Sequence, residues 1–243
     1  MAPPPLAPKP RVLIGVCTLN EADNIVTMLP LLRRSVPDAD ILVIDDRSTD
    51  GTIQLVEAAA KQDPKIHLDV RDERGLGGAI RHAMQAAVDR GYDFFINLDG
   101  DLSHNPQQLP QLLERSLALP AVDVVIGSRY VDQGKIVGWP MHRRIMSRMV
   151  NRFATLCLRL PVQDCSGSMR CYRVSAIEKI SLGTMRSNGY SVLEEILVRL
   201  HRNGSPMAEV PITFTDRLRG QSKLTPKEAA RSIWQMLKLA AGS

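Results

Sequence analysis

Two acidic residues, Asp99 and Asp101, stand on either side of one glycine at the end of an apolar run, residues 94–98. We expect this run to form a buried strand whose carboxyl end points the two acids into a ligand crevice. Like charges this close are costly unless a cation joins them. Mg²⁺ or Mn²⁺, held by one or two carboxylates and completed by phosphate oxygens, would offset that cost. An isolated Asp-Gly-Asp favours a simple acidic turn, but a second acidic strand end, Asp45-Asp46, strengthens the metal hypothesis.

Polar residues also follow other apolar runs of the N-terminal half. These strand ends are Asn20-Glu21, Asp45-Asp46 and Ser128-Arg129. Because the carboxyl ends of parallel strands meet at one edge of a sheet, we expect them to share a crevice with Asp99 and Asp101. Carboxylates can bind a ribose hydroxyl, a base edge or a metal, and an arginine binds phosphate through paired hydrogen bonds. The pattern predicts transfer of a group from a metal-bound nucleotide diphosphate.

The elements that would position these residues alternate along residues 11–130. Apolar runs at 12–17, 41–44, 94–98 and 122–126, and a weaker one at 66–70, are separated by stretches with helical periodicity. Near-continuous apolar strands between amphipathic helices indicate a mostly parallel sheet covered on both faces. The prediction is an α/β, Rossmann-like, doubly wound fold. The run Gly75-Leu76-Gly77-Gly78 matches neither a Walker A motif nor the dinucleotide fingerprint, and we expect it to allow close helix–strand packing.

The predicted globular domain spans residues 11–224, between a proline-rich tail at 1–10, expected to be disordered, and a C-terminal amphipathic helix at 225–243. Within the domain, residues 140–160 form a basic amphipathic helix in which arginines interleave with apolar residues. Such a helix can lie on a membrane or pack against the core, and the sequence favours neither. For the C-terminal helix, docking onto the domain is at least as good an interpretation as membrane contact.

The composition of the 243 residues, 44% hydrophobic and 23% charged, is that of one globular domain. The net charge of +5 suits phosphate-bearing ligands or an anionic membrane surface. Four Phe, four Tyr and two Trp are too few for a base-stacking platform, so we expect no nucleic-acid partner. The four cysteines lack metal-ligand spacing and are interpreted as reduced thiols. No uninterrupted apolar stretch is long enough to predict a transmembrane helix.

Seven strings of residues resemble the dolichol-phosphate mannose synthase branch of the inverting GT-A glycosyltransferases, in family order from about residue 12 to 224. The Asp-Asp-x-Ser and Asp-x-Asp strings mark only the large superfamily, whereas those from Gly127 onward are specific to the polyprenyl-phosphate branch. The strings are Cys17-Thr18-Leu19-Asn20-Glu21, residues 44–52, residues 98–104, Gly127-Ser128-Arg129-Tyr130, Arg143 with Ser147, residues 164–170, and Asp216-Arg217 through Ser222-Lys223-Leu224.

The resemblance implies a GT-A fold that moves mannose from GDP-mannose to a polyprenyl or dolichyl phosphate with inversion, using Mg²⁺ or Mn²⁺. It also implies roles for individual residues. The nucleotide would contact Cys17, Leu19, Glu21, Ile44 and Asp46. The metal and the diphosphate would bind to Asp99 and Asp101 and to the backbone of Gly100, and Arg217 and Lys223 would close over the diphosphate. The acceptor phosphate would bind to Arg129, Arg143 and Ser147. The reacting centre would thus comprise Asp101, Arg129, Arg143 and Ser147.

This chain departs from the family pattern at three positions. The family usually has proline and tyrosine where this chain has Cys17 and Leu19, and commonly alanine at Gly100. Leucine cannot stack on a base as tyrosine does, which softens the prediction of nucleotide specificity.

A polyprenyl phosphate with a second pKa of about 6 is mostly dianionic at neutral pH and needs no strong base. His104, the histidine nearest the acids, is therefore expected to cap or pack its loop. Asp164 and Glu195 could bind sugar hydroxyls, although a structural salt bridge is favoured for each.

Alternative functions are a UDP-glucose-dependent transferase acting on the same lipid, transfer to a sugar hydroxyl with Asp164 as base, and a catalytically silent nucleotide-sugar-binding subunit. The expected location is the cytosolic face of a membrane, the endoplasmic reticulum in a eukaryote or the plasma membrane in a bacterium or archaeon. Attachment there would be peripheral, through the basic helix or through small membrane subunits.

Overall fold

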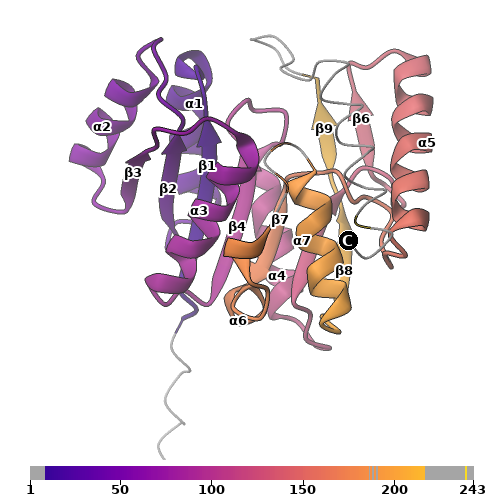
Figure 1. The fold of residues 1–243 in the computed structure, drawn as a ribbon. Coiled ribbons are helices and arrows are strands. Elements are labelled where there is room, and N and C mark those ends of the chain that lie inside the picture. The colour runs from indigo at the N-terminus through magenta and orange to yellow at the C-terminus, as the bar shows by residue number, and fades with distance from the viewer. Residues whose placement is uncertain (1–8, 186, 188, 190, 217–238, 240–243) are drawn as a thin grey trace, which may run out of the picture.

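The computed structural model describes residues 9–185, 187, 189, 191–216 and 239. Its main sheet has seven strands in the order β3-β2-β1-β4-β7-β5-β8 (Figure 1). All run parallel except β7, which lies antiparallel between β4 and β5. The strands are β1 (Val12–Thr18), β2 (Asp40–Asp45), β3 (Ile66–Val70), β4 (Phe94–Asp99), β5 (Val124–Ser128), β7 (Arg170–Arg173) and β8 (Met207–Pro211).

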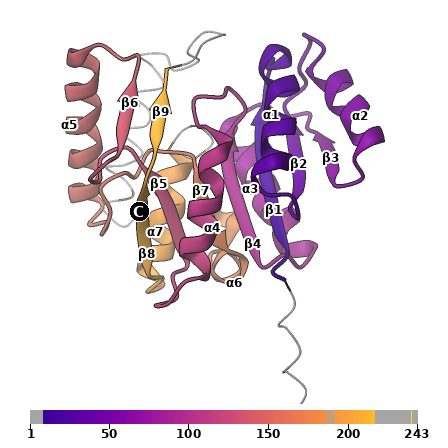
Figure 2. The same ribbon diagram turned by 180° about the vertical axis from the view of Figure 1, so that it is seen from behind.

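Helices cover both faces of this sheet. Alternate residues of β1 enter two separate hydrophobic cores, because successive side chains of a strand point to opposite faces: Leu13 packs with α3, α6 and α7, and Ile14 with α1, α2 and α4. Figures 1 and 2 show the two layers from opposite sides. The helices are α1 (Ala22–Ser35), α2 (Thr52–Gln62), α3 (Leu76–Asp89), α4 (Leu109–Leu117), α5 (Met141–Cys157), α6 (Val174–Ile177) and α7 (Val192–Arg202).

The predicted doubly wound α/β fold is confirmed, and the five predicted strands all form. The weak run at 66–70 is β3, and each of the other strands begins or ends within two residues of its prediction. The predicted helix near 107–119 begins instead as a 3₁₀ turn, Pro106–Gln108, that continues into α4.

A second, two-stranded sheet and α5 stand beside the main sheet (Figure 1). Strands β6 (Lys135–Val137) and β9 (Thr213–Thr215) pair in parallel. Helix α5 confirms the helix predicted at 140–160, and its buried residues are small or polar. Its large apolar residues face outward, between 45% and 68% exposed: Met141, Ile145, Met146, Met149, Val150, Phe153 and Leu156. The sequence left open which way this face points, and the structure turns it away from the core.

The ends of the chain lie mostly outside the described residues, including residues 1–8 of the predicted tail and all but Leu239 of the predicted C-terminal helix. Among the helices that the structure describes, none combines the length and hydrophobicity that a bilayer crossing requires.

Candidate functional site

The carboxyl ends of β1, β2 and β4 place several predicted nucleotide residues side by side. Cys17 is in register with Ile44 on one side and with Asp99 on the other. Burial raises the pKa of the Cys17 thiol, and the nearby charges of Asp99 and Asp46 raise it further. The thiol therefore stays neutral, and both carboxylates act on it from adjoining strand ends.

The neighbouring acids Asp45 and Asp46 have different environments. The Asp45 carboxylate is fully buried and accepts hydrogen bonds from Thr18 Oγ1 at 2.8 Å and from the Ser48 backbone N–H at 2.6 Å. Asp46 instead accepts from Arg71 Nη1 at 2.8 Å and from the Gly75 N–H at 2.7 Å. Asp45 thus stabilises the turn after β2, and Asp46 is held between Arg71 and the residue that precedes α3.

Arg71 lies at the predicted nucleotide site and was not predicted from the sequence. Its guanidinium occupies the space that a side chain at Gly78 would fill, since a Cβ there would overlap its Nη2 atom. The Gly75–Gly78 run thus allows a close approach, as predicted, but the approaching group is an arginine side chain that follows β3. An arginine directly after a strand and a few residues before paired glycines was the available signal.

The loop after β1 holds the other predicted nucleotide residues, Leu19 and Glu21. Glu21 precedes α1, and its carboxylate accepts a hydrogen bond from Asn24 Nδ2 at 2.7 Å. Its backbone N–H donates to Thr52 Oγ1 at 2.9 Å, which ties this loop to the start of α2. The segments that follow β1 and β2 are therefore joined at this edge of the sheet.

Of the predicted metal residues, Asp99 ends β4 and Asp101 lies on the turn that follows it. Asp101 is buried, and its Oδ1 accepts hydrogen bonds from the backbone N–H and the hydroxyl of Ser103. Leu102 between them has a φ of +59°, a left-handed conformation that costs a leucine about 1 kcal/mol or more. A Cβ on Gly100 would lie 3.1 Å from Thr18 Cγ2 and 3.3 Å from the Cys17 carbonyl oxygen, so this turn packs tightly against β1.

The donor set at this turn fits a hard divalent cation. Asp99 and Asp101 offer carboxylate oxygens, which Mg²⁺ and Mn²⁺ prefer. In the part of the chain that the structure describes, no group of three or more His, Cys, Asp or Glu side chains is arranged to hold a metal by itself. A cation here would therefore complete its coordination with water and with diphosphate oxygens.

At the end of β5, Arg129 forms a buried ion pair with Asp164. Arg129 Nε and Nη2 donate to the two carboxylate oxygens of Asp164 at 2.8 Å each, with the side chains 8% and 0% exposed. Burial alone would raise the pKa of Asp164, but the charge and hydrogen bonds of Arg129 outweigh it and lower the pKa to about 2. Desolvation likewise opposes the charge on Arg129, and Asp164 more than compensates, so the pKa of Arg129 is raised.

These contacts support the structural interpretation of the two other acids considered from sequence. Asp164 is committed to Arg129, and Glu195 accepts from Arg199 Nη2 at 2.8 Å and from the Ser187 N–H at 2.9 Å. His104 is buried with its ring edge-on to another aromatic ring, in line with the packing role predicted for it.

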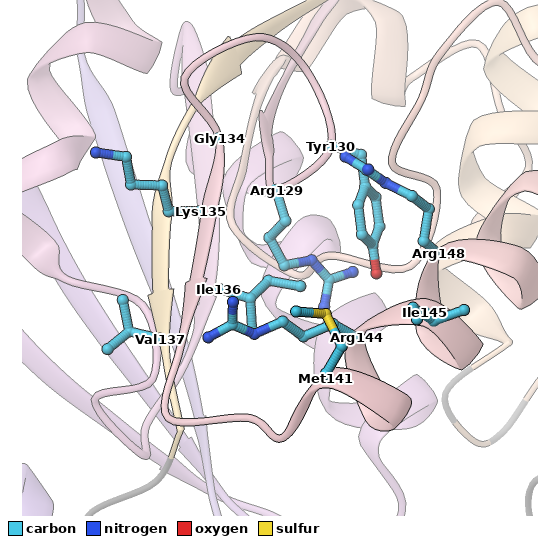
Figure 3. A pocket seen from close by; sticks show the side chains of 10 residues that line it. All are labelled: Arg129, Tyr130, Gly134, Lys135, Ile136, Val137, Met141, Arg144, Ile145 and Arg148. Carbon is cyan, nitrogen blue, oxygen red and sulfur yellow. The ribbon is translucent and has the colours of Figure 1, made fainter.

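A pocket of about 490 Å³ lies between β6 and α5, next to Arg129 (Figure 3). Its lining combines cations with apolar side chains. The cations are Arg129, Lys135, Arg144 and Arg148, and the apolar residues include Ile136, Val137, Met141 and Ile145. Sequence reasoning had not assigned Arg144 and Arg148 to a ligand site, although their spacing of four places them on one face of a helix.

The other residues predicted to hold the acceptor phosphate lie at the edge of this pocket. Ser147 Oγ is 2.7 Å from the hydroxyl of Tyr130, which lines it. Arg143 is not among the lining residues; its Nη1 donates to Asp216 Oδ2 at 3.3 Å, and its guanidinium lies 4.0 Å from the centre of the Trp139 ring. Arg217 and Lys223 fall outside the described residues.

Comparisons with known proteins agree with one another. Residues 13–181 match the model of the family described as glycosyl transferase family 2. An undecaprenyl-phosphate mannosyltransferase of Micrococcus luteus is 39% identical over 88% of this chain and 88% of its own. A polyprenol monophosphomannose synthase of Mycolicibacterium smegmatis is 34% identical over 96% of this chain and 88% of its own.

Among solved structures, glucosyl-3-phosphoglycerate synthase of Mycobacterium tuberculosis, in complex with Mn²⁺, UDP-glucose and phosphoglyceric acid, superimposes with a TM-score of 0.70. The match covers 96% of this chain and 80% of that one at 16% identity. At that identity the likeness bears on the fold alone, which has the GT-A architecture.

Proposed function

The chain belongs to glycosyl transferase family 2, and from this membership we propose that it transfers mannose from GDP-mannose to a polyprenyl phosphate, such as dolichyl phosphate, with inversion. The observation that carries the proposal is the pocket between β6 and α5. Three arginines meet aliphatic side chains there, which matches a phosphate attached to a hydrocarbon chain. The two curated relatives, a mannosyltransferase acting on undecaprenyl phosphate and a polyprenol monophosphomannose synthase by name, support the same acceptor and sugar.

The donor would bind across the ends of β1, β2 and β4. Asp46, held by Arg71, and the loop around Glu21 present hydrogen-bond acceptors for the nucleoside. Mg²⁺ or Mn²⁺ bound to Asp99 and Asp101 would neutralise charge on the diphosphate leaving group. The Mn²⁺ and UDP-glucose in the M. tuberculosis complex support a divalent metal beside the nucleotide sugar in a protein of this fold.

Positioning explains how these residues would promote transfer. The acceptor phosphate and the donor diphosphate are both anions and repel each other. Arg129, Arg144 and Arg148 would hold the acceptor phosphate in line with the anomeric carbon. A dianionic phosphate oxygen attacks without losing a proton, so no residue needs to act as base. Asp164 is held as a carboxylate by Arg129, and both of its oxygens already accept hydrogen bonds, which disfavours it as a base.

Helix α5 would attach the enzyme to the membrane that contains its acceptor. Its outward apolar face is accompanied by exposed arginines, which favours burial of that face among anionic lipids. The membrane face would be the cytosolic one, where nucleotide sugars are present. Small membrane subunits could add to this attachment.

The decisive experiment supplies the purified protein with Mn²⁺, a polyprenyl phosphate in detergent, and either GDP-mannose or UDP-glucose. We expect mannolipid from GDP-mannose. Glucolipid from UDP-glucose would instead favour the glucosyltransferase alternative, and no glycolipid from either donor would refute the proposal in favour of a silent binding subunit.

A matched pair of variants on α5 tests the acceptor pocket. Arg148→Gln removes a pocket cation and should raise the KM for the lipid phosphate by about tenfold or more, because a hydrogen bond to a charged group contributes about 1.5–3 kcal/mol. Arg152→Gln changes an exposed arginine one turn further along, outside the pocket, and should leave that KM unchanged. Equal effects of the two variants, or equal loss of donor and acceptor affinity in Arg148→Gln, would contradict the assignment.

A further inference from the structure

Phe214, in the middle of β9, contacts three groups from separate parts of the chain. Its ring centre lies 5.2 Å from that of His104 and 5.4 Å from that of Trp139, and both ring pairs are edge-on. The guanidinium carbon of Arg129 lies 5.5 Å from the same ring centre. Edge-on ring pairs and cation–ring contacts are both attractive, and both depend on the aromatic ring.

The contact with His104 leads to the donor side of the site. His104 and Phe214 form an isolated antiparallel bridge, and the Thr215 N–H donates to the Ser103 carbonyl at 3.0 Å. Ser103 in turn donates its N–H and hydroxyl to Asp101. Ser103 thus links β9 directly to Asp101, the carboxylate proposed to bind the metal, so a shift of β9 would move Asp101.

The other two contacts lead to the acceptor side. Arg129 lines the pocket between β6 and α5. Trp139 lies two residues before α5, and in the part of the chain that the structure describes its indole N–H has no hydrogen-bond partner. Its contacts with the Phe214 ring and with the Arg143 guanidinium, 4.0 Å from its ring centre, therefore hold the indole in place.

We propose that Phe214 is a positioning residue that couples donor binding to acceptor binding. This inference rests on the proposed function for the identity of the two substrates. Nucleotide diphosphate and metal bound at Asp99 and Asp101 would set the position of His104 and hence of the Phe214 ring. The ring, together with Asp164, then sets the position of the Arg129 guanidinium at the acceptor pocket, and it contacts Trp139 just before α5. Since such coupling is reciprocal, each substrate should tighten the binding of the other by the same factor.

The primary test measures the Kd of a short-chain polyprenyl phosphate in detergent with and without saturating GDP and Mg²⁺. We expect the nucleotide to tighten acceptor binding by about five- to tenfold in the wild-type protein. Phe214→Leu keeps an apolar side chain but removes the ring, so the factor should fall to about one. Phe214→Tyr keeps the ring and should restore the factor.

The fluorescence of Trp139 gives a second readout that does not depend on turnover. The sequence contains two tryptophans, so Trp234→Phe leaves Trp139 as the only one. GDP with Mg²⁺ should change the Trp139 emission in this background and in its Phe214→Tyr derivative, but not in Phe214→Leu. Phe94→Leu makes the same substitution at the opposite end of β4 from Asp99, and this control should lose stability without losing the response.

The outcomes separate this inference from the proposed function. Unaltered coupling in Phe214→Leu, a loss that Phe214→Tyr shares, or independent binding of the two ligands to an active wild-type protein would each overturn the role of the ring. Absence of any glycolipid product would refute the proposed function, and the Trp139 response to GDP and Mg²⁺ would still decide whether Phe214 transmits a change from the donor side.

Discussion

Replacing Asp164 with asparagine tests whether its pair with Arg129 is a structural ion pair. Asparagine preserves the shape of the side chain but leaves a buried guanidinium without its counter-charge. The lowering of the Asp164 pKa from 3.8 to about 2 corresponds to about 2 kcal/mol of stability at neutral pH, and no solvent screening applies to a fully buried carboxylate. Breaking a buried pair by removing one partner typically costs about 3–5 kcal/mol. We therefore expect Asp164→Asn to lose about 2–5 kcal/mol.

Urea unfolding at pH 7, followed by circular dichroism, measures this loss. The matched control is Asp72→Asn, which breaks the pair between Asp72 and Arg47, whose side chains are 80% and 64% exposed. Exposed pairs contribute about 0–1 kcal/mol, so the control should remain close to the wild type.

The same variant makes a prediction about pH with a defined sign. A carboxyl group whose pKa is lowered by folding stabilises the protein above its unfolded pKa and loses that effect as the pH falls through its folded pKa. The gap between wild type and Asp164→Asn should therefore narrow as the pH falls from about 4 to about 2. A loss below about 1 kcal/mol at pH 7, or a gap that stays constant across that range, would refute the buried ion pair as described.

Three further predictions concern other parts of the molecule. Burial raises the pKa of Glu194 from 4.5 to about 7, so the free energy of unfolding should fall as the pH rises between these values. In urea unfolding, Glu194→Gln should match the stability of the wild type at pH 4.5 and exceed it by about 3 kcal/mol above pH 7. Glu178→Gln changes an exposed residue and should show no such trend. Gly78→Ala should displace the guanidinium of Arg71 from the Asp46 carboxylate and weaken GDP binding about tenfold, as calorimetry would measure. Unchanged GDP affinity would contradict this role of Arg71. Met149→Asp on the outward face of α5 should lower the partition of the protein onto anionic vesicles by about tenfold in a sedimentation assay, whereas Met149→Leu should leave it unchanged. Equal partition of the two variants would exclude this face from membrane contact.

The sequence was most informative where a strand is apolar from end to end. Residues 94–98 and 41–44 are buried on both faces of the sheet, so the apolar run and the strand nearly coincide. Strand β7 could not be found in this way, because four residues that include two arginines carry no such run. The Arg170 side chain is fully buried there and donates to the carbonyl oxygens of Cys165, Gly167 and Leu193. Those acceptors come together only in the folded protein.

The same limit explains what was missed at the site. Strand ends predicted that Asp46, Asp101 and Arg129 lie at one edge of the sheet, because parallel strands align their carboxyl ends. Asp164, the partner of Arg129, lies on a loop whose conformation no local pattern specifies. Arg71, the partner of Asp46, had only a weak signal, its place directly after β3 and before the paired glycines.

Helix periodicity has a related limit. It showed which residues of α5 share a face but not what that face would meet. The structure turns it outward.

The antiparallel insertion of β7 has a consequence for how the protein folds during synthesis. Strands β1 to β4 pair among themselves in the order in which they leave the ribosome, apart from the later contact of β4 with β7. Among the described strands, β5 pairs with β7 and β8, both of which are synthesised after it. Pairings between residues far apart in sequence form slowly, since a long loop must close first. The half of the sheet proposed to bind the nucleotide should therefore form while the chain is still being made, and the half proposed to bind the lipid should assemble only once β8 has emerged.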